Sequence, residues 1–367
     1  MALRFVHTAD WQLGRPFTRF ADELAGRLRA ARLDAIDRLA AAARAHGAAH
    51  VLVAGDVWDH ETPSAATLRQ PLDLMARAND LDWWLLPGNH DPARPDGLWQ
   101  RLVRLGPPAN VHLCVEPAPV PLTDDAWLLP APLTAKRAEG DPTAAWDGLA
   151  TPADAARIGL AHGAVADVAD TGEAGALIAP DRATRAGLAY LALGDWHGRL
   201  EVDRRTWYAG TPEPDRFRAN DPGWCLVVTV AGPAEPPRIE PVATARFRWR
   251  EARLALVSGM DLEAVDRLAR DDAVPASRTL ARVTLAGSLG LAERAALGAR
   301  LEALAHRLAH LEWRDDDLLT LAGAGDLDAL GETGSLRAAA EALAARAADE
   351  PAARRALELL YGWATQP

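Results

Sequence analysis

Five short polar segments of this chain each follow a short apolar stretch, and each carries side chains that can bind a metal ion. The segments are His7-Thr8-Ala9-Asp10-Trp11-Gln12, Gly55-Asp56-Val57-Trp58-Asp59, Gly88-Asn89-His90-Asp91, Ala161-His162-Gly163 and Gly194-Asp195-Trp196-His197. In open α/β sheets, the crevice beyond the carboxyl ends of the strands is where ligands bind. The pattern therefore predicts an α/β core that gathers the five segments at its strand ends.

The order of these side chains suits a site for two metal ions. A carboxylate that bridges two cations supplies shared negative charge, while an amide and imidazoles complete the shells without over-neutralising the metals. Two cations held in this way activate water and clamp a phosphate ester for in-line attack. One Gly-Asp-x-x-Asp segment occurs by chance, but all five segments in this order predict a two-metal phosphoester hydrolase.

The five segments resemble the motifs of the calcineurin-like binuclear metallophosphoesterases, and most nearly those of SbcD-type DNA repair nucleases. That branch reads His-Thr-x-Asp-x-His-Leu-Gly, Gly-Asp-x-x-Asp, Gly-Asn-His-Asp, His-Gly and Gly-His-x-His. The resemblance spans residues 3–225 by motif. Gln12 and Asp195 stand where this family has histidine. Oxygen donors at these positions favour Mn²⁺ or Mg²⁺ over Zn²⁺; the alternative interpretation is a degenerate, non-catalytic site.

The resemblance implies two divalent cations, Mn²⁺ in the first place and Mg²⁺ in the second, held by seven side chains. One ion takes Asp10, Gln12 and His197, the other takes Asn89, His162 and Asp195, and Asp56 bridges them. The resemblance further implies that His90 binds no metal and protonates or stabilises the leaving oxygen. Asp59 would orient and charge His90.

Other polar and aromatic residues near the motifs allow two interpretations. Arg199, Arg216 and Arg218 follow the last motif and either contact substrate phosphates or pair with neighbouring carboxylates. His7 lies inside the first apolar stretch, which favours a hydrogen-bonded structural role. The motif tryptophans either pack in the core or stack on a nucleobase; they are Trp11, Trp58 and Trp196.

The pattern of apolar residues predicts a mixed α/β (α+β) fold. Strands and helices alternate at first, with helices over 23–46 and 64–79, and the resemblance implies a two-sheet sandwich flanked by helices. We expect a metallophosphoesterase catalytic domain over 1–245 and a smaller α+β capping domain, which would bind DNA, over 246–325. A Gly/Asp-rich linker over 322–334 would then lead to a C-terminal helical hairpin over 335–367.

Composition limits the classes of protein that the chain can belong to. The net charge of −11 argues against a protein that coats nucleic acid, although it does not exclude a nuclease. Two cysteines provide no disulfide framework. The chain has no apolar signal segment at its start and no run of about 18 apolar residues, so we expect a cytoplasmic protein without a membrane span.

These observations together predict a metal-dependent DNA nuclease, an exonuclease or endonuclease that works in DNA repair. The alternatives are a phosphodiesterase or phosphatase for a small molecule, and a non-catalytic subunit that binds DNA or an ATPase. Expected partners are DNA, an SMC-like ATPase subunit and a second copy of the chain. The hairpin over 335–367 either docks on that ATPase or folds back on the core of its own chain.

Overall fold

The structure, a computed structural model, describes residues 2–166, 175–259, 262–270, 274–321, 334–347 and 349–365. Contacts between Cα atoms divide the chain into two compact units. The first unit comprises Met1–Asp215 and Asn220–Arg246, and the second comprises Arg216–Ala219 and Phe247–Pro367. Each unit is described separately below.

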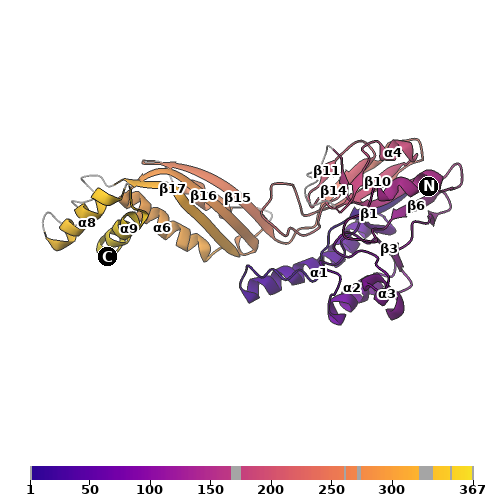
Figure 1. Ribbon diagram of the computed structural model, residues 1–367, viewed down its shortest axis with the longest axis horizontal. Coiled ribbons are helices and arrows are strands. Elements are labelled where there is room, and N and C mark those ends of the chain that lie inside the picture. Colours follow the sequence, from indigo (N-terminus) through magenta and orange to yellow (C-terminus); the bar gives the residue numbers. More distant parts are fainter. Residues whose placement is uncertain are drawn as a thin grey trace. The chain divides into compact units, whose positions relative to one another are not determined.

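The first sheet of the first unit has six strands in the order β14-β13-β1-β2-β3-β4. Figure 1 labels β14, β1 and β3 of this sheet. Four of them are parallel: β1 (Leu3–Thr8), β2 (His50–Val53), β3 (Asp82–Leu85) and β4 (Val111–Leu113). Two antiparallel strands extend the sheet beyond β1, and these are β13 (Trp224–Val230) and β14 (Arg238–Ala243). All four residues of β2 are buried, as expected for a parallel strand that is covered on both faces.

The second sheet also has six strands, in the order β11-β12-β10-β7-β6-β5. Its parallel centre consists of β6 (Ala126–Ala131), β7 (Ala156–His162), β10 (Tyr190–Gly194) and β12 (Thr206–Tyr208). Short antiparallel strands pair at its two edges, and these are β5 (Val120–Thr123) and β11 (Leu200–Glu201).

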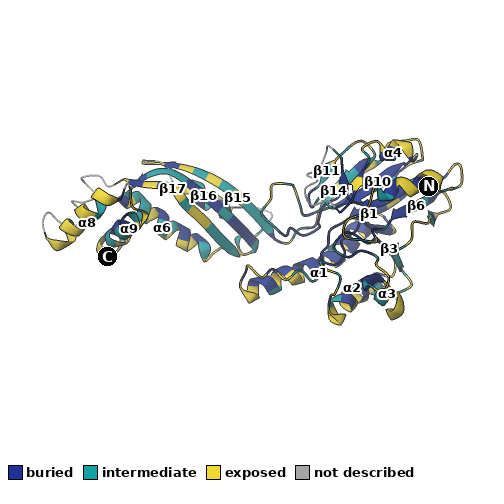
Figure 2. Ribbon diagram, viewed as in Figure 1, coloured by how far each residue is buried: buried dark blue, intermediate teal, exposed yellow. Residues whose placement is uncertain are grey.

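The two sheets share one buried apolar layer, which makes this unit a sandwich. Phe5 and Leu52 of the first sheet lie in the same hydrophobic cluster as Ile158 and Tyr190 of the second. Phe5 and Tyr190 contact each other directly, with ring centroids 5.6 Å apart. Figure 2 shows how this inner layer is buried while the outer turns of the helices are exposed.

Three helices cover the outer face of the first sheet. They are α1 (Asp22–Ala45), α2 (Ala65–Arg77) and α3 (Leu98–Leu105). Ile36 and Leu39 of α1 share a cluster with Val51 and Trp83 of the sheet. These two residues, three positions apart, lie on one face of the helix, as the helical spacing of apolar residues predicts.

The outer face of the second sheet is covered by shorter elements. They are η1 (Pro142–Gly148), α4 (Arg182–Arg185) and the two-stranded ladder of β8 (Ala164–Val165) and β9 (Leu177–Ile178). Trp146 of η1 is buried there against Leu191 and Tyr208. The two-sheet sandwich flanked by helices, which the sequence predicts, is thereby confirmed.

The second unit is built on three parallel strands in the order β15-β16-β17. They are β15 (Arg248–Val257), β16 (Thr279–Gly290) and β17 (His310–Leu321), connected through α5 (Glu263–Asp266), η2 (Arg267–Ala269), η3 (Ala276–Arg278) and α6 (Leu291–Ala305). One face of this sheet packs against the helices through Val283, Leu285 and Leu301. The small additional sheet expected after the first domain is therefore present.

Two C-terminal helices complete the second unit: α8 (Ser335–Arg346) and α9 (Pro351–Thr365). Leu357 and Tyr361 of α9 are buried in one cluster with Leu291 of α6. Arg294 of α6 pairs with Glu358 of α9 at 3.2 Å. The helices therefore fold back on their own unit. All of the expected linker except Gly334 lies outside the described residues.

Among the described residues, no helix is both long enough and apolar enough to cross a membrane.

Candidate metal centre

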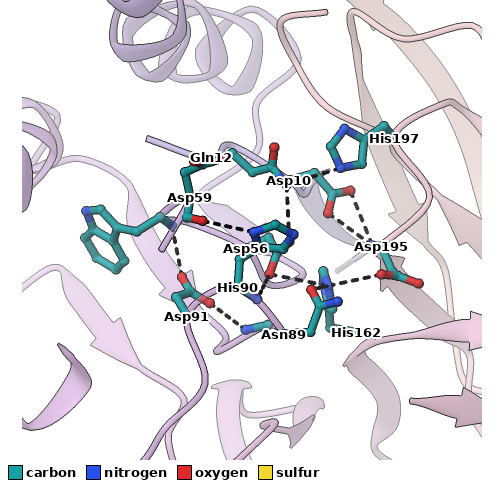
Figure 3. A network of polar contacts seen from close by, with 12 residues as sticks. Asp10, Gln12, Asp56, Asp59, Asn89, His90, Asp91, His162, Asp195 and His197 are labelled. Atoms are coloured by element: carbon teal, nitrogen blue, oxygen red, sulfur yellow. Dashed lines mark hydrogen bonds and ion pairs between the residues drawn. The ribbon is translucent and has the colours of Figure 1, made fainter. Parts of the chain in front are cut away.

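Parallel strands of both sheets carry the polar segments to one place. In the first sheet Asp10 follows β1, Asp56 follows β2 and Asn89 follows β3. In the second sheet His162 is the last residue of β7, and Asp195 directly follows β10. The side chains at these strand ends point toward one another (Figure 3). The sandwich thus places the carboxyl ends of strands from both sheets around one centre.

The backbone at this centre adopts a conformation that is uncommon for residues other than glycine. The angle φ is 54° at Asp10, 43° at Gln12, 54° at Asp56 and 101° at Asp195. Such residues cost about 1–3 kcal/mol each and persist only where the surrounding structure fixes them. The Gln12 amide, for example, donates to the Asp56 carbonyl at 2.8 Å. Strain of this kind clusters at functional sites.

Two glycines allow the segments to approach closely. A Cβ atom on Gly55 would lie 2.3 Å from Nδ1 of His162, and one on Gly88 would lie 2.2 Å from Oδ1 of Asp56. Neither distance is compatible with a side chain, so glycine at both positions lets the polar groups sit this close. This accounts for the glycine that begins the second and third segments.

Nε2 of His162 faces a group of oxygen atoms. Its Nδ1 lies 2.8 Å from the Ala54 carbonyl, which can only accept, so Nδ1 carries a proton. Its Nε2 lies 3.2 Å from Oδ1 of Asn89, 3.5 Å from Oδ1 of Asp56 and 3.7 Å from Oδ1 of Asp195. If the imidazole is neutral, Nε2 and these three oxygen atoms are all hydrogen-bond acceptors, and no hydrogen atom lies between Nε2 and the oxygens. Either a proton on Nε2 or a cation among the acceptors relieves this repulsion.

The pKa values of these buried groups reflect the same crowding of negative charge. Burial alone would lower the pKa of His162, but Asp56, Asp10 and Asp195 raise it to about 9. Burial raises the pKa of Asp195 to about 6 and also raises that of Asp10, although nearby histidines oppose both shifts. A bound divalent cation would favour the deprotonated form of every one of these groups.

A second group of side chains lies on the other side of Asp56. Oδ2 of Asp56 and Nε2 of His197 are each 3.4 Å from the side-chain nitrogen of Gln12. Nδ1 of His197 lies 3.2 Å from Oδ1 of Asp215, so the carboxylate holds the imidazole with its Nε2 free of a proton when the ring is neutral. A lone pair on Nε2 is the form that binds metals.

The donors at this centre fit divalent cations. Asp10, Asp56 and His162 each offer one ligand atom within 4.8 Å of the others, and all three are buried. Carboxylate oxygens and imidazole nitrogens suit Mn²⁺ and related ions. The structure brings together all seven side chains that the sequence singles out as ligands. Which of them bind a cation remains a prediction.

His90 and Asp59 are in contact, but not in the way the resemblance implies. Nδ1 of His90 donates to the backbone carbonyl of Asp59 at 2.9 Å. The carboxylate of Asp59 instead accepts from Nη1 of Arg15 at 3.2 Å. Nε2 of His90 lies 3.9 Å from Oδ2 of Asp56, and the His90 side chain is 38% exposed. Asp59 therefore orients His90 through its backbone carbonyl.

Asp91 joins two of the segments, and the sequence analysis assigned it no role. Its buried carboxylate accepts from the backbone amides of Trp58 at 2.9 Å and Gly88 at 2.7 Å. Burial raises its pKa well above the ordinary range, with further help from the charge of Asp56. The available signal was its place as the last residue of Gly-Asn-His-Asp.

Arg32 ties the first segment to the chain beyond the last one. Its buried guanidinium donates to the carbonyls of Asp10 at 2.9 Å, Trp11 at 2.7 Å and Glu213 at 2.8 Å, and to Oγ1 of Thr211 at 3.2 Å. An arginine within the apolar face of a helix was the signal that could have identified it.

His7 and the motif tryptophans are mostly structural. Nε2 of His7 lies 3.1 Å from the Leu193 carbonyl and its Nδ1 lies 2.9 Å from the Tyr190 hydroxyl. Burial lowers the pKa of His7 to about 3, which keeps the ring neutral. Trp11 and Trp58 are buried in the core between the first sheet and its helices. The core interpretation is confirmed for these two tryptophans.

The three arginines proposed to contact substrate occupy different surroundings. Arg199 pairs with Asp221 at 2.7 Å and lies over the ring of Trp224 at 4.6 Å. Arg216 and Arg218 belong to the short segment that groups with the second unit. Arg199 thus pairs with a neighbouring carboxylate, which is the second of the two interpretations from the sequence. A role in binding phosphate remains a prediction for all three arginines.

Comparisons with known proteins identify a family for part of this chain. Residues 3–171 match the sequence profile described as "Calcineurin-like phosphoesterase". A search of curated protein sequences found no significant match. Among solved structures, the crystal structure of TT1561 of Thermus thermophilus has a TM-score of 0.43 and 11% identity, and covers 66% of this chain and 100% of its own. The matched residues 3–171 contain the segments of Asp10, Asp56, Asn89 and His162.

The chain therefore carries a calcineurin-like metallophosphoesterase domain. Domains of this family hydrolyse phosphoesters with divalent metal ions, and the buried Asp10, Asp56 and His162 are placed where they could hold such an ion.

Proposed function

We propose that this protein is a metal-dependent DNA nuclease of the SbcD-like type, which hydrolyses phosphodiester bonds at a two-metal site. The observation that carries the proposal is the convergence of Asp10, Asp56 and His162 at the strand ends of the sandwich. The motif order and the second unit that follows support the nuclease branch, because a small-molecule esterase needs no additional DNA-binding unit.

In this proposal the metal ligands divide into two sets around Asp56. Asp10 and His197 hold one ion, and Asn89, His162 and Asp195 hold the other. Two bound cations would supply the Lewis acidity that polarises the phosphoryl group and lowers the pKa of water. Mn²⁺ is the expected ion, with Mg²⁺ weaker because it dehydrates reluctantly.

The residues around the metal position have separate tasks. Asp215 holds the ring of His197 through Nδ1, and the Ala54 carbonyl does the same for His162. His90 is the proposed proton donor to the leaving oxygen. Since the Asp59 carbonyl occupies its Nδ1, the proton would leave from Nε2, the nitrogen that faces Asp56.

The partners remain part of the proposal. An SMC-like ATPase would contact the exposed apolar residues of the C-terminal helices, which are Leu336, Leu359 and Trp363 at 39%, 39% and 71% exposure. Leu359 and Trp363 also line a groove of about 670 Å³ with Trp313 and residues of α6. The capping role of the second unit, a second copy of the chain and a cytoplasmic location complete the proposal.

The deciding experiment is an assay with Mn²⁺ on end-labelled single- and double-stranded DNA. We expect cleavage by the natural chain with Mn²⁺, weaker cleavage with Mg²⁺ and Zn²⁺, and none by the matched variant Asp56→Asn. A small ester such as bis(p-nitrophenyl) phosphate is the comparison substrate. Hydrolysis of the small ester without any cleavage of DNA would reject the nuclease proposal in favour of a small-molecule phosphodiesterase.

A further inference from the structure

The side-chain amide of Gln12 has a defined orientation. One of its terminal atoms lies 2.6 Å from Nη1 of Arg15. A guanidinium can only donate, so the atom that it contacts is the amide oxygen. The amide nitrogen consequently faces Oδ2 of Asp56 and Nε2 of His197, each at 3.4 Å.

Arg15 is itself held in place. The same Nη1 atom lies 3.2 Å from Oδ1 of Asp59 and 3.4 Å from Oδ2 of Asp215. Turning the amide of Gln12 by half a rotation would bring its NH₂ group against the guanidinium, donor to donor. The carboxylates of Asp59 and Asp215 oppose any movement of Arg15 that would relieve this clash.

The N–H groups of Gln12 therefore lie on the atoms that a cation would use. Asp215 accepts a hydrogen bond from Nδ1–H of His197, and this tautomer of the neutral ring carries its lone pair at Nε2. That lone pair and one oxygen of Asp56 both face the amide nitrogen of Gln12. A nitrogen that carries two protons cannot bind a metal ion, so the amide occupies this position as a competing hydrogen-bond donor.

We infer that Arg15 and Gln12 are positioning residues that weaken one of the two metal positions, the one formed by Asp10 and His197. Arg15 fixes the amide oxygen, and the amide nitrogen competes with a cation for Asp56 and His197. Among the described contacts, the amide of Gln12 does not face Asn89, His162 or Asp195, so its competition acts on the position of Asp10 and His197 alone. The inference rests on the proposed two-metal function, and it replaces the expectation that Gln12 is a ligand.

The test is a calorimetric titration of Mn²⁺ into the full-length, metal-free protein, with metal counted by mass spectrometry. We expect two ions that bind in unequal steps. Gln12→Met removes the amide and should tighten the weaker step by roughly tenfold, the size typical for residues that act on metal ligands. A weaker second step or the loss of one ion would overturn the inference, because it would make Gln12 a ligand. Gln12→Leu repeats the test if the methionine variant does not fold.

A double-mutant cycle isolates the part played by Arg15. Arg15→Met should tighten the weaker step more when Gln12 is present than when residue 12 is Met, since only the first case releases the amide. Equal effects in both backgrounds would mean that Arg15 acts by its charge alone and would overturn its role. Arg44→Met removes an exposed arginine that pairs with Asp80 and controls for the change in net charge. A natural chain that binds no Mn²⁺ would instead reject the two-metal proposal itself.

Discussion

At the scale of single residues, the centre concentrates buried and half-buried acidic groups on a strained backbone around His162. Asp10, Asp56 and Asp195 all stand at positive φ, and Nε2 of His162 faces the carboxylates of Asp56 and Asp195 within 4 Å. Such an arrangement costs stability, and proteins retain this kind of cost where it serves a function. A divalent cation would turn the repulsion among these groups into binding energy.

The catalytic assignment predicts different outcomes for two neighbouring residues. His90→Ala should retain bound metal but lose turnover by roughly 10²–10⁴-fold, as expected for the loss of a general acid. Asp56→Ala should lose both metal and activity. His60→Ala is the control, because His60 is an exposed histidine on the neighbouring loop. Metal content and cleavage rate are measured for each variant, and unchanged cleavage by His90→Ala would assign the acid role to another group.

The pKa shifts predict that metal affinity increases with pH. His162, with a pKa raised to about 9, is protonated at neutral pH in the metal-free protein, whereas Asp195, with a pKa raised to about 6, has mostly lost its proton. Mn²⁺ must displace the His162 proton, so its affinity should rise between pH 7 and 9 by up to about tenfold per pH unit. Calorimetry in two buffers of different ionisation heat measures the release, expected to be about one proton. Constant affinity over this range would contradict the prediction.

At the scale of elements, the strand ends were predictable and the contacts between loops were not. Each polar segment follows an apolar run, so its place after a parallel strand could be read from the sequence. The expected helix over 23–46 is found at Asp22–Ala45. Arg32 and Asp215, by contrast, act on residues far away in the sequence, and no local pattern encodes such pairs. The contact of His90 with the Asp59 carbonyl escaped prediction for the same reason, since the carboxylate of Asp59 pairs with Arg15, which lies 44 positions earlier in the chain.

Arg32 provides a test of how the loops are held. Arg32→Met should lower the free energy of unfolding by about 3 kcal/mol, because three buried carbonyls lose a charged donor. Metal affinity should fall as well, since the carbonyl of the ligand Asp10 is one of the three. Chemical denaturation and a Mn²⁺ titration measure the two effects. Arg44→Met, at an exposed pair with Asp80, should change neither. An Arg32→Met protein with unaltered metal affinity would show that this anchor does not position the site.

At the scale of the whole molecule, the fold class could be predicted but the packing of the C-terminal helices could not. The sequence shows too many large apolar residues over 335–363 to leave in water, which is compatible with a partner or with the chain's own core. In the structure the apolar residues of α9 divide into two groups. Leu357 and Tyr361 are buried against α6, whereas Leu359 and Trp363 are exposed. A chain with a net charge of −11 would also gain from a partner that brings it to DNA.

This division changes how docking on an SMC-like ATPase should be tested. Truncation after residue 334 would uncover Leu291 and is expected to destabilise the second unit, so loss of the partner would not be specific. Two leucines of α9 offer a matched pair instead. Leu357→Ala, at a side chain 1% exposed, should lower the free energy of unfolding by about 2–5 kcal/mol. Leu359→Ala, at 39% exposure, should leave the denaturation midpoint unchanged.

The docking proposal then predicts that Leu359→Ala combined with Trp363→Ala weakens co-purification with the ATPase while metal content stays normal. The reason is that both residues line the same groove beside α6, so a partner helix seated there would bury them together. Co-purification and metal content are measured on the same preparations. The single Leu359→Ala variant should co-purify less than the natural chain and more than the double variant. If the double variant binds the ATPase as well as the natural chain does, the exposed apolar face of α9 is not the docking surface.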